Sequence, residues 1–105
     1  MPQRGGRPGL SGQRAAPEPY DVEITVEGRR NLARLPEKIA DVVHAFVFEA
    51  LAAMPKRVGK PLVGEFKGLW SARREQYRVV YEIDDLRHVV LIHRVAHRRD
   101  VYRPR

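Results

Sequence analysis

Two arginines in the middle of the chain, Arg73 and Arg78, are spaced so that they could hold an anion between them. Residues 69–74 and 77–83 predict two strands, and the two residues between them predict the turn of a hairpin. In that hairpin Arg73 lies directly opposite Arg78, and two guanidinium groups so placed repel each other. Either both side chains extend into water, or an anion such as phosphate lies between them and accepts their paired N–H groups.

Side chains alternate between the two faces of a strand, which gives this hairpin an apolar and a polar face. We call the face with the two arginines the arginine face, and it also carries Ser71 and Val80. The opposite face carries apolar and aromatic side chains, namely Trp70, Ala72, Val79 and Tyr81. We expect this second face to lie on the helices and the arginine face to be open to solvent.

A second group of cations comes directly after the last predicted strand. Residues 97–103 read His-Arg-Arg-Asp-Val-Tyr-Arg, which places cations, an imidazole and a phenol close together. An imidazole titrates near neutral pH and can therefore transfer protons under physiological conditions. This segment strengthens the anion-site hypothesis, and an inert basic tail is the alternative.

The chain is strongly basic, and its charge is unevenly distributed. The whole net charge of +7 lies in residues 55–105, which carry 13 basic and 6 acidic side chains, whereas residues 1–54 carry 7 of each. A basic half beside a neutral half predicts a surface that meets a polyanion or an acidic partner. A basic surface without a specific partner is the alternative.

Composition and motifs exclude several other kinds of chemistry. The 105 residues include no cysteine, which rules out disulfides, thiol catalysis and cysteine metal sites. No phosphate-binding P-loop, dinucleotide-binding glycine motif or H-E-x-x-H zinc motif occurs. The 4 scattered histidines make a poor metal site, and neither Ser11 nor Ser71 has an evident base. We therefore expect no metal and no cofactor.

Length and composition predict one soluble domain preceded by a short arm. Residues 1–19 hold four glycines and four prolines without apolar periodicity, so we expect a disordered N-terminal arm. Residues 20–105 are expected to form the folded domain. No apolar run approaches the roughly 20 residues of a membrane span, and no signal peptide is recognisable. These features predict a cytoplasmic protein.

The hydrophobic pattern predicts an α+β fold. Strict alternation predicts strands, and apolar residues at helical spacing predict two helices, the second of which ends at Pro55. The predicted elements in chain order are a strand, two helices, a basic connector and three strands, at 20–26, 28–35, 36–54, 55–67, 69–74, 77–83 and 88–95. We expect a small antiparallel sheet with the two N-terminal helices packed on one face.

Five short stretches of the chain together resemble one known protein family. They are LPEKI at 35–39, GKPL at 59–62, KGLWSAR at 67–73, YRVVYEID at 77–84 and HRRDVYR at 97–103. In this order, and with this order of predicted elements, they resemble the RelE branch of the RelE/ParE toxin superfamily. The resemblance covers about residues 20–103, nearly all of the predicted domain.

The resemblance implies the toxin component of a type II toxin–antitoxin system, neutralised by a RelB-like antitoxin. RelE-like toxins enter the ribosomal A site and cleave the mRNA there without a metal ion, through attack of an RNA 2′-hydroxyl on the adjacent phosphate. The implied activity is a metal-independent endoribonuclease that inhibits translation, with the ribosome and mRNA as partners. A toxin this basic is expected to bind ribosomes in a salt-sensitive way.

The family's functional positions fall largely on residues already singled out by their charge. The catalytic residues that the resemblance implies are Arg73, Arg78, Arg98, Tyr102 and His97. The last two are candidates for general acid and base, and Tyr102 has the alternative role of stacking on a nucleobase. Further cations are expected to bind RNA or the ribosome, namely Lys60, Lys67, Arg74, Arg94, Arg99 and Arg103.

The sequence departs from the family at two strand positions. RelE-type members often carry lysine or arginine where this chain has Ser71, and Leu69 occupies another position that can be lysine. The candidates to replace these cations are Lys60, Lys67 and Arg74. The departure keeps open a ParE-like toxin that inhibits DNA gyrase without nuclease activity. A non-catalytic basic binding module is the third alternative.

Overall fold

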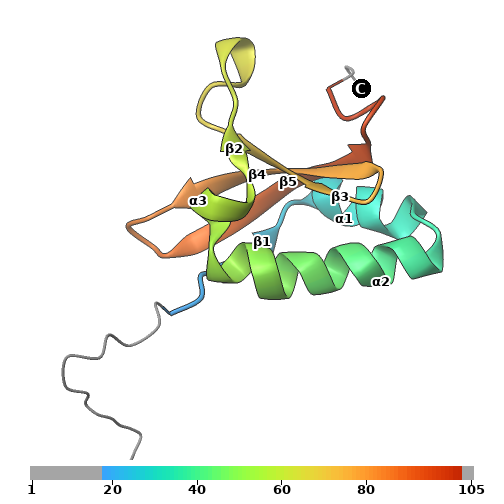
Figure 1. Cartoon of the computed structure of the whole chain (residues 1–105), viewed down its shortest axis with the longest axis horizontal. Helices are drawn as coiled ribbons and strands as arrows, with labels where there is room; N and C mark the ends of the chain where they lie inside the picture. Colours follow the sequence, from blue (N-terminus) through green and yellow to red (C-terminus); the bar gives the residue numbers. More distant parts are fainter. Residues whose placement is uncertain (1–17, 103–105) are drawn as a thin grey trace, which may run out of the picture.

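The structure is a computed structural model that describes residues 18–102, so the predicted arm lies almost entirely outside the described residues. Its centre is one sheet with the spatial order β1-β5-β4-β3-β2 (Figure 1). The strands are β1 (Asp21–Ile24), β2 (Lys60–Pro61), β3 (Trp70–Arg74), β4 (Tyr77–Asp84) and β5 (Val89–His97). The helical segments are α1 (Val26–Arg34), α2 (Glu37–Phe46), η1 (Val47–Leu51), α3 (Pro55–Val58) and η2 (Gly64–Phe66).

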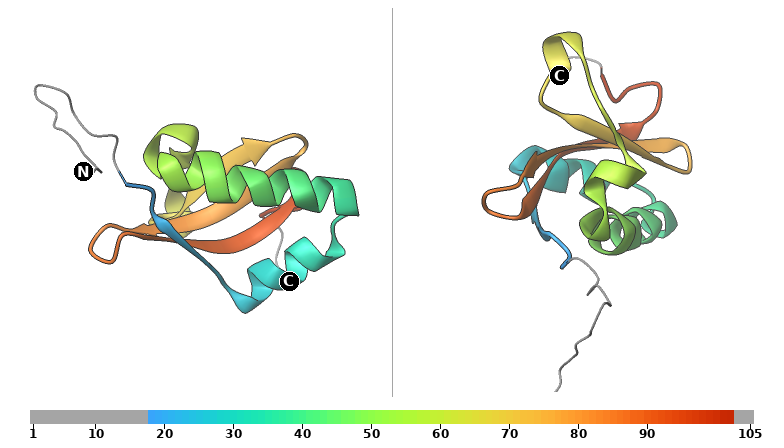
Figure 2. Two further views of the ribbon diagram at one scale, coloured as in Figure 1. Left: turned by 90° about the horizontal axis from the view of Figure 1, so that it is seen from below. Right: turned by 60° about the vertical axis from the view of Figure 1, so that its left-hand side comes forward.

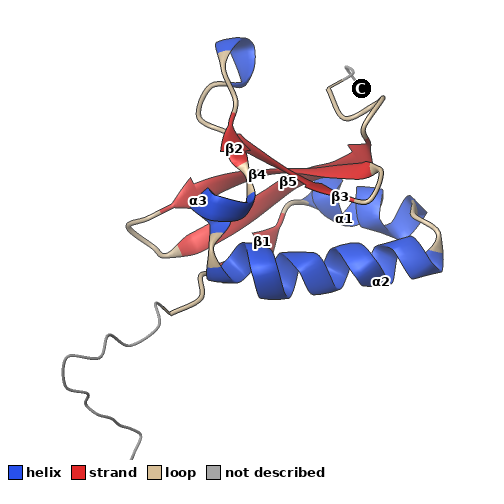
Figure 3. Cartoon of the chain, viewed as in Figure 1, coloured by secondary structure: helices blue, strands red, loops and turns tan. Residues whose placement is uncertain are grey.

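The helices and the sheet form two layers with the core between them. Helix α2 runs beneath the sheet, while the β2–β3 connection and the C-terminal segment rise on the other side (Figure 3). Figure 2 shows α2 crossing one face of the sheet, while α1 follows β1 and lies beside β5. The largest fully buried side chains come from the α2–η1 helix, from β4 and β5 and from the C-terminal segment, namely Val43, Leu51, Val79, Tyr81, Val90, Ile92, Val95 and Val101. The predicted α+β fold is confirmed.

The β3–β4 hairpin has the register that the alternation predicts. The paired residues are Arg74–Tyr77, Arg73–Arg78, Ala72–Val79, Ser71–Val80 and Trp70–Tyr81. Ala72, Val79 and Tyr81 are at most 1% exposed, because their shared face lies on the helices. Glu75 at the turn has a φ of 59°, the left-handed region that tight hairpin turns favour.

The sheet is mixed, which corrects the prediction of a wholly antiparallel one. Strand β1 pairs in parallel with β5, with Asp21 opposite Val89 and Ile24 opposite Ile92. Two parallel strands need a long connection between them. Here the helices and the β3–β4 hairpin together supply that connection, and no local sequence pattern reports the direction of such a pair.

The first strand also ends earlier than predicted, because Thr25 starts a helix. Its side chain accepts the Gly28 N–H at 3.0 Å, so Val26 becomes helical and is 66% exposed. Gly28 lies directly on β5, since a Cβ there would come within 2.9 Å of the Ile92 carbonyl oxygen. Helix α1 then continues along the edge of β5, where Asn31 Oδ1 accepts the Val95 N–H at 2.9 Å.

A π-helical turn lies within the long helix beneath the sheet. The α2 segment passes directly into η1, and buried Val43 of α2 is followed at intervals of four residues by Val47 and Leu51 of η1. In a regular α-helix, four residues overshoot one turn by about 40°. The wider π turn corrects this drift and keeps the three side chains on the sheet.

The connector and the last strand both contain more structure than predicted. Pro55 ends the long helix and also begins the short helix α3, and β2 then pairs Lys60 with Ser71. Strand β5 continues to His97, because its end pairs with Tyr77. Within the described part of the chain, no helix is both long and apolar enough to cross a membrane.

Candidate functional site

Three neighbouring strands bring cations into one hollow at the β2 edge of the sheet. The hollow has a volume of about 280 Å³ and is lined by Val58, Gly59, Lys60, Ser71, Arg73 and Arg78. Lys60 on β2 is paired with Ser71 on β3, and Arg73 on β3 is paired with Arg78 on β4. We call this the cationic hollow.

No carboxylate of the described residues forms an ion pair with the cations of the hollow. Among residues 18–102, none of Lys60, Arg73 and Arg78 forms an ion pair. Two cations directly opposite each other on neighbouring strands destabilise the sheet that holds them. An anion with several acceptor oxygens would remove this repulsion and accept the guanidinium N–H groups in pairs.

A buried hydroxyl also faces the cationic hollow without a partner. Ser71 is 7% exposed, and its Oγ has no hydrogen-bond partner among the described residues. Leaving a buried polar group unpaired costs about 1–3 kcal/mol. A phosphate oxygen in the hollow would accept the Ser71 O–H, so the serine and the arginines select the same kind of ligand.

The backbone that lines the cationic hollow packs against a buried tyrosine, Tyr81. Tyr81 donates its O–H to the Pro55 carbonyl oxygen at 2.6 Å, and burial raises the pKa of Tyr81 to about 12. Gly59 passes directly over this hydroxyl, since a Cβ at position 59 would overlap the Tyr81 oxygen. This close approach fixes the backbone that carries Lys60.

Tyr102 lies beside the cationic hollow, on the same face of the sheet. It borders a second hollow of about 200 Å³ together with Phe66, Val80 and Arg94. Its ring is 5.2 Å from the Phe66 ring, and its side chain is partly exposed. Val80 is paired with Ser71, so the two hollows are neighbours.

Arg94 holds the C-terminal segment in place, a role that the sequence did not indicate. Its guanidinium donates to the Val101 carbonyl oxygen at 2.6 Å and pairs with Glu27 on α1 at 3.3 Å. Val101 is 1% exposed and Val80 is 5% exposed. The arginine face is therefore covered around Val80 and open around the cationic hollow, which corrects the expectation of a wholly open face.

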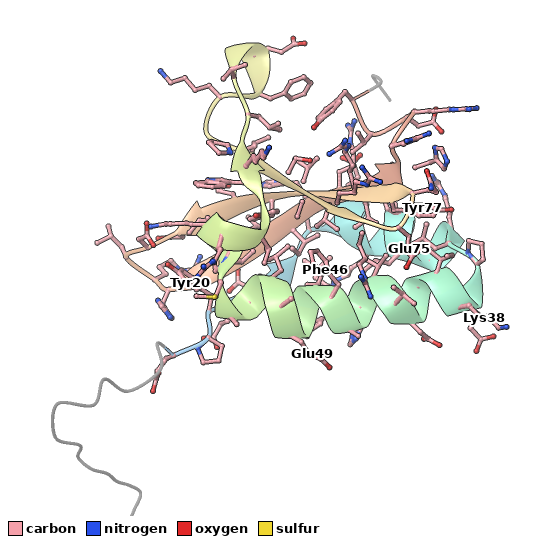
Figure 4. The ribbon with its side chains drawn as sticks, in the orientation of Figure 1. Tyr20, Lys38, Phe46, Glu49, Glu75 and Tyr77 are labelled. Atoms are coloured by element: carbon pink, nitrogen blue, oxygen red, sulfur yellow. The ribbon has the colours of Figure 1, made fainter. Side chains whose placement is uncertain are left out.

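His97 and Arg74 lie on the other face of the sheet, toward the helices. His97 pairs with Tyr77, and their rings meet edge to face at 5.6 Å, while its Nδ1 accepts the Arg99 N–H at 3.2 Å. Arg74 borders a hollow of about 550 Å³ against α2, where Phe46 rises toward the sheet (Figure 4). Neither side chain lines the cationic hollow.

The remaining predicted cations lie at the ends of elements. The Arg98 N–H donates to the Gln76 carbonyl oxygen at 2.8 Å, which brings this residue beside the β3–β4 turn. Lys67 is exposed just after η2, and Arg99 is exposed in the turn that follows β5. Arg103 lies outside the described residues. No cluster of three or more histidine, aspartate and glutamate side chains suited to a metal ion occurs among residues 18–102.

Comparisons with known proteins identify the family. Residues 22–102 match the family model for the ParE toxin of the type II toxin–antitoxin system parDE. Toxin RelG of Mycobacterium tuberculosis is 49% identical over 85 residues, which cover 81% of this chain and 98% of that protein. Toxin RelE of the same organism is 53% identical over 85 residues, covering 81% of this chain and 88% of that protein.

Solved structures share the fold. A chain in the crystal structure of the toxin–antitoxin complex RelBE2 from Mycobacterium tuberculosis has a TM-score of 0.75 and 49% identity, covering 78% of this chain and 94% of that chain. The isolated E. coli RelE toxin has a TM-score of 0.62 at 16% identity, over 74% of this chain and 83% of that chain. The chain therefore belongs to the ParE toxin family of type II toxin–antitoxin systems, and within it the chain is a RelE-like toxin.

Proposed function

We propose that this toxin is a metal-independent endoribonuclease that cleaves mRNA on the ribosome and thereby inhibits translation. The observation that carries the proposal is the cationic hollow, which Lys60, Arg73 and Arg78 line together with an unpaired buried hydroxyl and, among the described residues, no carboxylate. An RNA phosphodiester is the anion that this surface suits best, because nucleic-acid backbones are bound by clustered cations.

In the proposed reaction the cationic hollow holds the scissile phosphate while the neighbouring RNA 2′-oxygen attacks it. The oxygen–phosphorus bond to the 2′-oxygen forms, and the bond to the 5′-oxygen breaks. Arg73 and Arg78 stabilise the negative charge that develops on the phosphate oxygens, and they do so without titrating. Ser71 donates its O–H to one of these oxygens.

Tyr102 and the C-terminal cations would act on the RNA next to the hollow. Tyr102 borders the neighbouring hollow with an aromatic partner, Phe66, so it suits stacking on a nucleobase or proton transfer at the 2′-oxygen. Arg98, just after the end of β5, would approach the same RNA strand. His97 is a weaker candidate for proton transfer than the sequence suggested, since its ring contacts Tyr77 on the helix side.

A second proposal concerns the partner that restrains the toxin. The Mycobacterium tuberculosis relative was crystallised as the toxin–antitoxin complex RelBE2. By extension this chain would bind a RelB-like antitoxin, whose acidic and apolar segment would cover the sheet and residues 97–102. Bound there, it would prevent RNA from reaching the arginine face.

The alternative function is inhibition of DNA gyrase by protein contact. The observation that favours it is the family match itself, because the matching model describes the ParE toxin of parDE. Ser71 and Leu69 in place of strand cations are compatible with a toxin that cuts no RNA. The two functions share one fold, so only an activity measurement separates them.

The deciding experiment is primer extension on mRNA from cells that express the protein, with a gyrase supercoiling assay alongside. We expect cuts confined to translated frames and supercoiling that proceeds normally. The Arg78→Ala variant should give intact transcripts under the same conditions. Intact transcripts with the wild-type protein, together with blocked supercoiling, would support the gyrase alternative instead.

A further inference from the structure

Three cations of the described chain line the cationic hollow, and among these only Lys60 carries a proton that it can give away. Guanidinium groups stay charged throughout the range in which proteins work, whereas an ammonium group is an acid. We propose that Lys60 is the general acid that protonates the leaving 5′-oxygen. This inference rests on the proposed RNA cleavage and names a residue for one of its steps.

Strand pairing brings Lys60 to the arginine face. Strand β2 pairs with β3 at two positions, and the Lys60–Ser71 pair is the one nearer the arginines. Paired residues on neighbouring strands point to the same face, so Lys60 extends on the side where Ser71, Arg73 and Arg78 line the hollow. Within residues 18–102 it forms no ion pair that would hold its ammonium elsewhere.

The backbone around Lys60 is held from both sides. Before it, Gly59 packs over the Tyr81 hydroxyl, as described above. After it, Pro61 has a fixed φ, and the Leu62 N–H donates to the Leu69 carbonyl oxygen at 2.9 Å. A short strand anchored at both ends can position a lysine precisely enough for proton transfer.

No other group that lines the cationic hollow fits this role. The Ser71 hydroxyl is a far weaker acid than an ammonium and is needed as a donor to the phosphate. Tyr102 borders the neighbouring hollow, and His97 lies on the helix side of the sheet. Lys60 is therefore assigned as the general acid.

The proposed step balances in atoms and charge. The RNA 2′-hydroxyl loses its proton to solvent water as its oxygen bonds to phosphorus. The bond from phosphorus to the 5′-oxygen breaks at the same time, and its electron pair stays on that oxygen. The proton of the Lys60 ammonium moves to the 5′-oxygen, which leaves as a hydroxyl. The neutral amine then regains a proton from water.

The test uses ribosomes loaded with a synthetic mRNA that carries sulfur in place of the bridging 5′-oxygen at the cut site. A thiolate leaves without being protonated, so the general acid is not needed for this substrate. On the normal mRNA we expect Lys60→Ala to cleave about 100-fold more slowly, the lower range of general acid catalysis. On the sulfur substrate the same variant should cleave within threefold of the wild type, a roughly thirtyfold recovery.

Three further variants sharpen the test. Lys60→Arg keeps the charge without an available proton and should be nearly as slow as Lys60→Ala on normal mRNA. Arg78→Ala should be slow on both substrates, because its charge stabilisation is needed for either leaving group. Lys38→Ala is the matched control, since Lys38 lies at the far end of α2 (Figure 4) and should cleave both substrates normally.

Each adverse outcome has a distinct meaning. A Lys60→Arg variant as fast as the wild type, or a Lys60→Ala variant equally slow on both substrates, would show that Lys60 acts only through its charge and would overturn the assignment. Thermal unfolding of each variant checks that it is folded. If the wild-type protein cleaves neither substrate, the proposed nuclease function fails, and the assignment of Lys60 fails with it.

Discussion

Within the described chain, charged side chains are paired at one end of this small sheet and unpaired at the other. At the β4–β5 turn, Asp85 accepts the Tyr20 O–H at 2.7 Å and pairs with Lys56 at 2.9 Å, while Arg87 pairs with Glu23 at 2.8 Å. At the cationic hollow, the described cations have no carboxylate at all. The same chain thus builds a neutralised cluster at one end and a group of unneutralised cations at the other.

The neutralised charges hold the fold together, and the proposed function assigns the unneutralised charges to a ligand. The cluster around Asp85 ties the start of β1 to α3 and to the β4–β5 turn, with Tyr20 at that end of the molecule (Figure 4). Within residues 18–102 the cations of the hollow form no ion pair, and repulsion between them weakens the hairpin that carries them. An arrangement that lowers stability points to binding or catalysis.

The largest expected effect comes from removing one arginine of the hollow. Arg78→Ala should slow single-turnover cleavage of ribosome-bound mRNA at least 100-fold, as loss of one transition-state donor typically does. Arg99→Ala, which removes an exposed arginine of the C-terminal turn, should cost much less. Equal losses of cleavage rate in the two variants would mean that the position of an arginine does not matter for cleavage, and would count against the proposed site.

A smaller effect, on the free energy of unfolding, is expected when the buried tyrosine beneath the hollow loses its proton. The Tyr81 pKa of about 12 lies above the ordinary value of 10.0, so the unfolded chain loses this proton first as the pH rises. The associated stability is complete below pH 10 and disappears as the pH rises toward 12, a loss of about 2 kcal/mol in the free energy of unfolding. Urea titrations of the wild type between pH 8 and 11.5 should show the start of this decline.

The matched control for the tyrosine is Tyr81→Phe. At pH 8 this variant should be less stable by about 1 kcal/mol, because the Pro55 carbonyl oxygen loses its donor. Its stability should fall less steeply than that of the wild type above pH 10. Parallel curves for the two proteins would show that Tyr81 does not carry the alkaline transition.

Reversing one charge in the cationic hollow should give the hollow a stabilising ion pair like those at the β4–β5 turn. Arg73→Glu places a carboxylate opposite Arg78, and the free energy of unfolding should rise by about 0.2–1 kcal/mol while cleavage is lost. Arg74→Glu is the control, because it faces Tyr77 and lies near Asp41 and Glu49, where another carboxylate should lower stability. A less stable Arg73→Glu protein would mean that the cations are already neutralised in the free protein.

The smallest effect on stability is expected at the β4–β5 turn, where the charges are neutralised. Hydrogen bonds from Tyr20 and Lys56 lower the pKa of Asp85, so its contribution to stability is present above about pH 4 and is lost as the pH falls further. Asp85→Asn should therefore unfold at a slightly lower temperature than the wild type at pH 7, and this difference should shrink as the pH falls below 4. A difference that does not shrink below pH 4 would have to come from something other than the ionised carboxylate.

The sequence predicted the pairing of Arg73 with Arg78 because the information there is local. Alternation fixed which residues of β3 share a face, and the short turn set Arg73 opposite Arg78. The same alternation places Arg74 with Ala72 on the helix side, although its charge suggested RNA binding. His97 could be placed only once β5 was seen to continue past residue 95.

Features that depend on distant parts of the chain were not predictable. Strand β2 has two residues, too few for any periodicity, and its pairing is what brings Lys60 beside Ser71. The bonds from Arg94 to Glu27 and Val101 join three separate segments. The family resemblance supplied the functional class, but it pointed to strand lysines that this chain lacks. The sequence offered Lys60, Lys67 and Arg74 as replacements and could not tell which of them lies beside the arginines.

The most direct test of the central claim compares two adjacent arginines on opposite faces of β3. Single-turnover cleavage of ribosome-bound mRNA should be about 100-fold slower for Arg73→Ala, which removes one side of the proposed phosphate site, than for the wild type. Arg74→Ala removes the same charge from the helix side and should lose at most a fewfold through weaker general attraction. Equal rates for the two variants would contradict the account, because net charge alone would then explain the activity.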